Sequence, residues 1–276
     1  MLTEIERAAS AVAEADNIFI GAGAGMGVDS GLPDFRGNEG FWKAYPPFRG
    51  KPFSEMANPK WFREDPALAW GFYGHRLNLY RETIPHAGFQ VLHQLCQGKS
   101  WFVFTSNVDG HFQKAGFDEE RILECHGSIH YLQCTDPACC RQNSDIWPAE
   151  EVRVQVNETT FRAQEPLPLC VSCGKVARPN ILMFSDSGWL HDRAYAQQRR
   201  FKNWVHGLTG KTVVIECGAG TAIPSVRLQC EDLVDSHDAT LIRINVREPE
   251  GPQGIISIDT RASEALAAIQ SARRQN

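Results

Sequence analysis

Apolar residues along this chain alternate between helical and strand-like spacing. Over residues 4–15 they recur every three or four positions, and residues 17–20 then form a continuous apolar run that ends in glycines. The first pattern is typical of a helix with one buried face, and the second predicts a buried strand that leads into a turn. Later apolar runs at 101–105, 121–124, 211–216, 240–245 and 254–258 repeat the strand pattern, and 262–272 predicts a closing helix. This alternation predicts an α/β fold with a Rossmann-type parallel sheet that binds ligands at the carboxyl ends of its strands.

Two segments interrupt the alternation. Residues 38–85 are rich in aromatic side chains and punctuated by proline, which favours short helices and loops over a regular sheet. Residues 131–177 carry five of the nine cysteines among polar connecting residues. We therefore expect one domain over residues 1–276, in which a helical module (38–85) and a cysteine-bearing module (131–177) are inserted into the Rossmann-type core and form a smaller lobe.

The composition narrows the possible classes of protein. With 42% hydrophobic and 22% charged residues, the chain has the composition of an ordinary soluble globular protein. Its net charge of -5 argues against direct binding of nucleic acid, for which a basic face is needed. The sequence contains no apolar run long enough to span a membrane, and its polar start does not resemble a secretory signal, so we expect a cytoplasmic protein without membrane contact.

A glycine-rich turn follows the first predicted strand, at Gly21, Gly23, Gly25 and Gly27. Glycine allows a backbone to come close to a diphosphate, and a helix N-terminus behind such a turn adds N–H donors. The same string also suits a tight turn without a ligand. The segment 30–37 (Ser-Gly-Leu-Pro-Asp-Phe-Arg-Gly) then places an acid and a base directly beyond the turn, where they could face a cofactor or pair with each other.

Four blocks in this order closely resemble the signatures of the sirtuins, which are NAD-dependent protein lysine deacylases. The glycine turn with residues 30–37 resembles their cofactor-binding signature, and residues 105–110 (Thr-Ser-Asn-Val-Asp-Gly) resemble their nicotinamide-pocket motif. Residues 124–127 (Glu-Cys-His-Gly) resemble their catalytic histidine block, and residues 178–184 resemble their substrate-pairing strand. The resemblance covers nearly the whole chain and implies a sirtuin-type catalytic domain.

The resemblance implies a role for each block. His126 is the implied catalytic base, because imidazole accepts a proton near neutral pH, and Asn107 orients the ribose and its water. Asp109 is implied to hold nicotinamide; on an extended segment it shares a face with Asn107, although an Asx-type turn explains the pair equally well. The residues implied to contact the cofactor NAD are Gly23, Ala24, Gly25, Asp34, Phe35, Arg36, Ser106, Asn107, Asp109, Gly218, Ala219, Gly220 and Asn245.

The chain departs from the family pattern at several of these positions. Ser106 stands where glutamine is most common, Gly27 where serine is usual, and Gly218–Gly220 replaces Gly-Thr-Ser. Fewer side chains could therefore hydrogen-bond the cofactor, which leaves a second outcome open: ADP-ribosyl transfer or NAD hydrolysis at the same site. A non-catalytic NAD-binding or interaction module is disfavoured, since His126 and Asn107 are both retained.

The cysteine module has the spacing of a structural zinc site. Cys170 and Cys173 form a close pair, and the partner pair is Cys134 with Cys139 or Cys140. Four thiolates favour zinc and leave no open coordination position, which indicates a structural metal. The sequence alone does not decide between Cys139 and Cys140, and resemblance to sirtuins favours Cys139.

The implied substrate is an acyl-lysine protein or peptide, bound through Met183 and Phe184 of the substrate-pairing strand. Tyr73 and Arg76 lie three residues apart, so on a helix they share a face, and together they could bind a carboxylate. The pair resembles the Tyr-x-x-Arg signature of sirtuins that prefer succinyl or malonyl lysine. It is also compatible with a core tyrosine beside a surface arginine.

Overall fold

The computed structural model describes residues 2–33, 37–143, 145–157 and 159–275. Its largest element is a parallel sheet of six strands in the order β11-β10-β9-β1-β2-β3. The bounds of these strands are β1 Asn17–Ala22, β2 Ser100–Thr105, β3 Ile122–Glu124, β9 Thr212–Cys217, β10 Thr240–Ile244 and β11 Ile256–Ile258. The prediction of a Rossmann-type parallel sheet is thereby confirmed.

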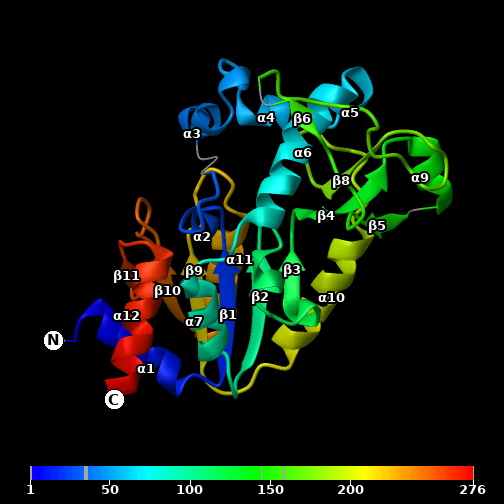
Figure 1. Ribbon diagram of the computed structural model, residues 1–276. Coiled ribbons are helices and arrows are strands. Elements are labelled where there is room, and N and C mark those ends of the chain that lie inside the picture. The colour runs from blue at the N-terminus through cyan, green and yellow to red at the C-terminus, as the bar shows by residue number, and fades with distance from the viewer. Residues whose placement is uncertain (1, 34–36, 144, 158, 276) are drawn as a thin grey trace.

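Helices cover both faces of this sheet (Figure 1). Side chains alternate between the faces, so Ile18 and Ile20 of β1 point to one side and Phe19 points to the other. The first face packs against three helices, α1 Glu4–Glu14, α7 Ala87–Leu95 and α12 Ala262–Gln275, and the second packs against α10 Asp192–His206 and α11 Ser225–His237. The strands are consequently buried on both faces, which explains their continuous apolar runs.

The order of the strands fixes where a ligand can bind. The chain adds β2 and β3 on one side of β1, and after a long excursion it adds β9, β10 and β11 on the other side. The connections therefore leave in opposite directions from the carboxyl ends of β1 and β9, which opens a crevice between them. Open α/β sheets bind their ligands at such a switch point.

A second lobe lies above the carboxyl edge of the sheet (Figure 1), and it is formed by parts of the connection from β1 to β2 and of the excursion from β3 to β9. Its helical part has its own core, in which Phe41, Tyr45, Trp70 and Phe72 are fully buried. The helices are α3 Gly37–Ala44, η1 Pro46–Phe48, α4 Phe53–Met56, α5 Trp61–Glu64 and α6 Pro66–Glu82. Asp65 begins α6 by accepting a hydrogen bond from the Leu68 main chain (3.2 Å), and Pro66 suits the first helical position.

The remainder of this lobe contains a three-stranded antiparallel sheet. Its central strand β4 lies between β5 and β8, and a register shift between Ser128 and Leu132 interrupts the pairing with β8. The elements are β4 Gly127–Cys134, α9 Pro137–Asn143, β5 Ile146–Pro148, β6 Val156–Asn157, β7 Arg162–Ala163 and β8 Ala177–Ile181. Only two residues, Cys125 and His126, separate β3 from β4, and this short link joins the two lobes.

Within the residues that the structure describes, no helix combines the length and the apolar character that crossing a membrane requires.

Candidate active site

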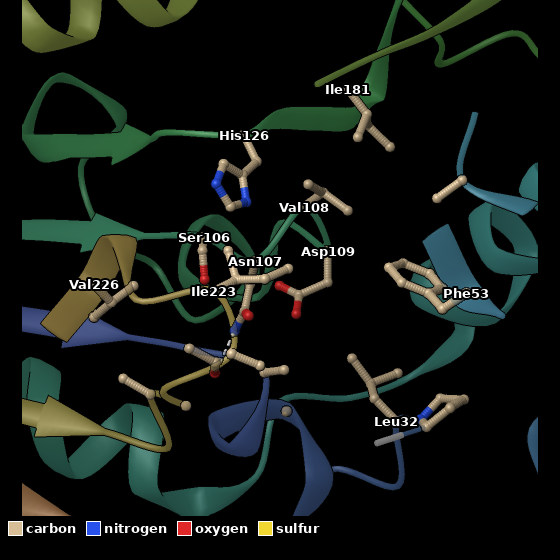
Figure 2. Close-up of a pocket in the computed structure, with 18 of the residues that line it drawn as sticks. Leu32, Phe53, Ser106, Asn107, Val108, Asp109, His126, Ile181, Ile223 and Val226 are labelled. Carbon is tan, nitrogen blue, oxygen red and sulfur yellow. Dashed lines mark hydrogen bonds between the residues drawn. The ribbon is translucent and has the colours of Figure 1, made fainter. Parts of the chain in front are cut away.

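A pocket of about 660 Å³ lies at the switch point, between the two lobes. Figure 2 shows side chains from both lobes converging on it, with the His126 ring facing Ser106, Asn107 and Ile223. Of the residues predicted for the site, twelve line this pocket: Gly23, Ala24, Tyr73, Arg76, Ser106, Asn107, Asp109, His126, Met183, Phe184, Ala219 and Gly220.

The two glycine turns form the floor of the pocket and touch each other. The Gly23 N–H donates to Cys217 O and the Gly25 N–H donates to Gly218 O, both at 3.0 Å. A Cβ on Gly23 would lie 2.7 Å from the Ala219 Cα, and one on Gly218 would lie 2.5 Å from Gly25. Glycine is therefore required because the turns after β1 and β9 pack backbone against backbone. This close approach leaves main-chain groups at the pocket wall, as diphosphate binding needs.

Asn107 connects the turn after β2 to the first glycine turn. Its main-chain N–H donates to the Thr105 hydroxyl (3.0 Å), and its side-chain amide donates to Gly23 O (3.0 Å). These bonds fix the side chain at the edge of the glycine turn, with the amide oxygen left to face the pocket. Asn107 can therefore take part in a turn and still lie in the wall of the pocket.

Asp109 is buried in the same wall, with 6% of its surface exposed. Burial raises the pKa of its carboxyl to about 6, even though the His111 main-chain N–H donates to Oδ1 at 2.9 Å. Figure 2 shows the carboxylate directed into the pocket beside Asn107. A buried acid whose pKa is raised and which faces a pocket is typical of a functional site.

His126 follows β3 and lies in the link between the lobes. Burial lowers the pKa of its imidazole, although a hydrogen bond with the Ser106 main chain acts in the opposite direction. Its Nε2 atom lies 3.5 Å from the hydroxyl of Ser225, at the start of α11. The ring is therefore neutral near neutral pH and can accept a proton.

A buried ion pair fixes the end of β3, directly before the link that carries His126. Glu124 is the last residue of β3, and one of its carboxylate oxygens accepts a hydrogen bond from Arg193 of α10 at 2.5 Å. The Gln197 side chain accepts a hydrogen bond from the Glu124 main chain (3.1 Å). Since Glu124 is 1% exposed, these contacts fix the strand end two residues before His126.

The segment after β8 forms the opposite rim, where Met183 and Phe184 line the pocket. The Leu182 N–H donates to His126 O and the Phe184 N–H donates to Ala57 O, both at 2.9 Å. Arg178 holds the segment from behind through a buried ion pair with Asp186. The rim is thus anchored to the link between the lobes on one side and to α4 on the other.

Tyr73 and Arg76 of α6 line the pocket together with Tyr80. Arg76 is 6% exposed, so it is not a surface arginine. The Tyr73 hydroxyl is buried without a hydrogen-bond partner among the described residues. A guanidinium and phenolic groups at the end of an otherwise largely apolar pocket favour a ligand that carries a carboxylate.

Four cysteines gather in the antiparallel lobe, with their sulfur atoms all within 4.8 Å of one another: Cys134, Cys139, Cys170 and Cys173. The Sγ–Sγ distance is 3.5 Å between Cys134 and Cys173 and 3.8 Å between Cys139 and Cys170. Thiolates about 2.3 Å from a tetrahedral zinc ion stand about 3.8 Å apart, so the cluster fits zinc. Cys140 instead directs its thiol to Cys134 O (3.2 Å).

Some predicted residues are not in the pocket wall. Gly25 and Gly218 lie behind it, in the contact between the two turns. Asn245 also lies behind it: its amide donates to Ala219 O (2.7 Å), and its oxygen accepts from the main chains of Arg247 and Glu248. Asp34, Phe35 and Arg36 fall outside the described residues.

The pocket also contains residues that the sequence did not indicate. Thr221, Ala222 and Ile223 follow the second glycine turn, and Arg247 and Glu248 follow β10. Both groups lie beyond strand ends, so the rule that ligands bind at the carboxyl edge of the sheet could have identified them. Apolar lining residues such as Leu32 and Phe53 carried no comparable signal.

Comparison with known proteins adds to this geometry. The sequence matches the model of the Sir2 family over residues 23–215. It is 31% identical over 273 residues to an NAD-dependent protein deacylase of Pyrococcus abyssi, covering 98% of this chain and 96% of the relative. It is 27% identical over 266 residues to NAD-dependent protein deacylase 1 of Archaeoglobus fulgidus, covering 95% and 94%. Among solved structures, a Sir2 homologue in complex with NAD has a similar fold, with a TM-score of 0.72, 23% identity and coverage of 98% and 94%.

Proposed function

This chain belongs to the Sir2 family, and on that premise we propose that it is an NAD-dependent protein lysine deacylase with His126 as its base. One observation carries the proposal: His126, Asn107 and Asp109 converge with both glycine turns on one pocket at the switch point of the sheet. The products are nicotinamide, the free lysine and an O-acyl-ADP-ribose.

The pocket fits NAD by its shape and its groups. We assign the diphosphate to the two glycine turns, where Ala24, Ala219 and Gly220 line the wall and can present main-chain N–H groups, and where Gly23 allows the close approach. We assign the ribose to Asn107 and Ser106 and the nicotinamide carboxamide to Asp109, because a carboxylate accepts hydrogen bonds from an amide. Asn245 positions the second turn from behind, and Asp34–Arg36 stay a prediction for the same cofactor.

Bound NAD supplies an ADP-ribosyl group whose bond to nicotinamide is broken when the acyl oxygen attacks. In this scheme the hydrogen bond with the Ser106 main chain holds the His126 ring in place. The lone pair of Nε2 then accepts the proton of a ribose hydroxyl, so that this hydroxyl attacks the acyl carbon. A water molecule adds to the same carbon, and the lysine amine leaves as the acyl group stays on the ribose. The 3.5 Å separation from Ser225 shows that a hydroxyl can approach Nε2.

Acyl-lysine enters from the opposite rim. Met183 and Phe184 lie on the segment that Arg178 and Asp186 brace, and we assign to this segment the binding of the peptide main chain. Cys134, Cys139, Cys170 and Cys173 would hold a structural zinc ion, which would tie the antiparallel lobe together. We also propose a cytoplasmic location, which is supported by the absence of disulfides among the nine cysteines, all of which lie within the described residues.

We infer the chemical class of the acyl group from Tyr73 and Arg76. Both line the end of the pocket that an acyl chain would reach, and Arg76 is buried there as a cation. A succinyl or malonyl group brings a carboxylate that pairs with Arg76 and accepts from the Tyr73 hydroxyl, whereas an acetyl group brings no such carboxylate. The site therefore favours acyl groups that end in a carboxylate.

The test is a peptide panel with NAD, in which nicotinamide release is followed by mass spectrometry for acetyl-, malonyl- and succinyl-lysine peptides of one sequence. The unmodified chain should turn over the acidic acyl peptides faster. Arg76→Ala should lower their kcat/KM by about 100-fold, because a charge-assisted pair is lost, and change the acetyl peptide little. An equal fall for acetyl and succinyl peptides would show that Arg76 does not select the acyl group.

A further inference from the structure

Tyr80 lies in the acyl end of the pocket, one helical turn beyond Arg76 on α6. It is 4% exposed, and its ring and that of Phe72 each lie 5.3 Å from the Arg76 Cζ. The guanidinium is thus placed among aromatic rings that restrict its plane. Because Tyr80 is this close to Arg76, it influences the orientation in which the guanidinium meets a substrate.

The hydrogen bonds between the two residues use the phenol oxygen in a particular way. Nε and Nη2 of Arg76 both donate to the Tyr80 hydroxyl oxygen, at 3.1 and 2.9 Å. A phenol oxygen offers two lone pairs and one hydrogen, and these two bonds occupy both lone pairs. The hydrogen of the Tyr80 hydroxyl must therefore point away from Arg76.

That hydrogen stays in place at neutral pH, because burial raises the pKa of the Tyr80 phenol. A second phenol faces the same space: the Tyr73 hydroxyl is buried and has no partner among the described residues. Leaving a buried hydroxyl unpaired costs free energy, so a site that keeps one is suited to a ligand that accepts from it. The pocket end thus holds two phenol donors beside one cation.

We propose that Tyr80 is a further specificity-determining residue, which holds the Arg76 guanidinium in place and donates its own O–H to the carboxylate of an acidic acyl group. The inference rests on the proposed acyl class and adds a residue to it. The alternative is that Tyr80 only occupies Arg76 and lowers its availability to a substrate. The two readings predict opposite effects of removing the hydroxyl.

Tyr80→Phe removes the hydroxyl and keeps the ring. We expect the KM for a succinyl-lysine peptide to rise about tenfold, as for the loss of one hydrogen bond to a charged group, with kcat and the acetyl-peptide constants unchanged within about twofold. Tyr195→Phe is the matched control, because it removes a phenol hydroxyl from an exposed position on α10. Tyr80→His restores a ring donor and should recover part of the succinyl preference.

The outcomes separate the two proposals. If Arg76→Ala is selective for acidic acyl peptides and Tyr80→Phe is not, the role of Tyr80 is wrong and the acyl class stands. A higher succinyl activity in Tyr80→Phe would also overturn the role, since Tyr80 would then sequester Arg76. An equal loss for all peptides, with a lower Tm, would make Tyr80 a packing residue. An unmodified enzyme without any succinyl preference removes the acyl class and the role of Tyr80 together.

Discussion

Asp109 is buried in the pocket wall, and the cost of ionising it there falls on the stability of the folded chain. Its carboxyl titrates at 3.8 as a free group and at about 6 in the fold. The contribution of Asp109 to stability is therefore most favourable below about pH 4, where the group is protonated in both states, and it falls as the pH rises to about 6. At neutral pH the folded chain carries the full penalty of a buried carboxylate.

Asp109→Asn should raise the free energy of unfolding at about pH 7 by about 1–3 kcal/mol, because asparagine removes the charge and can still accept from the His111 main chain. The difference should vanish at about pH 4. Urea unfolding at both pH values measures it, with Asp235→Asn, an exposed change on α11, as the control. Turnover of NAD should fall in the same variant. A variant that is less stable at neutral pH would show that the carboxylate has a compensating partner.

At the scale of single residues, the sequence identified several residues of the site but not the residues that contact them from distant parts of the chain. His126, Asn107 and Asp109 stand in short blocks that can be recognised without a structure. Ser225 reaches His126 from about 100 positions away along the chain, and no local pattern announces such a contact. Tyr80 was also missed, because its chemistry depends on the Arg76 rotamer.

At the scale of elements, strands were predicted better than helices. Both faces of the parallel sheet are covered, so strands such as β1 and β9 are continuous apolar runs that stand out in the sequence. By contrast, α6 spans Pro66–Glu82 within a segment for which short helices and loops were expected. It is buried on several sides, from Trp70 through Tyr80, so it has no single apolar stripe to identify it.

The cysteine cluster shows that the spacing of cysteines in the sequence does not by itself identify the four metal ligands. The pair Cys139 and Cys140 was ambiguous in sequence, because either could complete four ligands. On α9 neighbouring side chains point in different directions, and Cys139 turns toward Cys170 while Cys140 turns toward Cys134 O. We therefore assign Cys139 to the metal.

Cys139→Ser should lose the zinc, whereas Cys140→Ser should keep about one zinc ion per chain, since a tetrahedral thiolate site needs four ligands. Metal analysis of the purified variants measures this directly. The Tm of Cys139→Ser should fall with the loss of metal, and Cys140→Ser serves as the matched control on the same helix. Retention of zinc by Cys139→Ser together with loss in Cys140→Ser would reverse the assignment.

At the scale of the whole molecule, the pocket exists because two lobes meet at the switch point of one sheet. The turns after the strands of the parallel sheet contribute the glycines, Asn107 and Asp109, and the second lobe contributes Tyr73 and Arg76. The link at Cys125 and His126 is shared by both. Both lobes therefore contribute side chains to one pocket, and His126 lies on the link between them.

The central claim is that His126 acts as the base of lysine deacylation with NAD. The most direct measurement is a product balance by mass spectrometry after incubation with NAD and a succinyl-lysine peptide. The unmodified chain should form nicotinamide, free-lysine peptide and O-acyl-ADP-ribose in equal amounts. His126→Ala should lower this turnover by about 100-fold or more while still binding NAD in calorimetry, and the exposed His206→Ala should be unaffected. Nicotinamide release without deacylated peptide, or ADP-ribose attached to protein, would contradict the account.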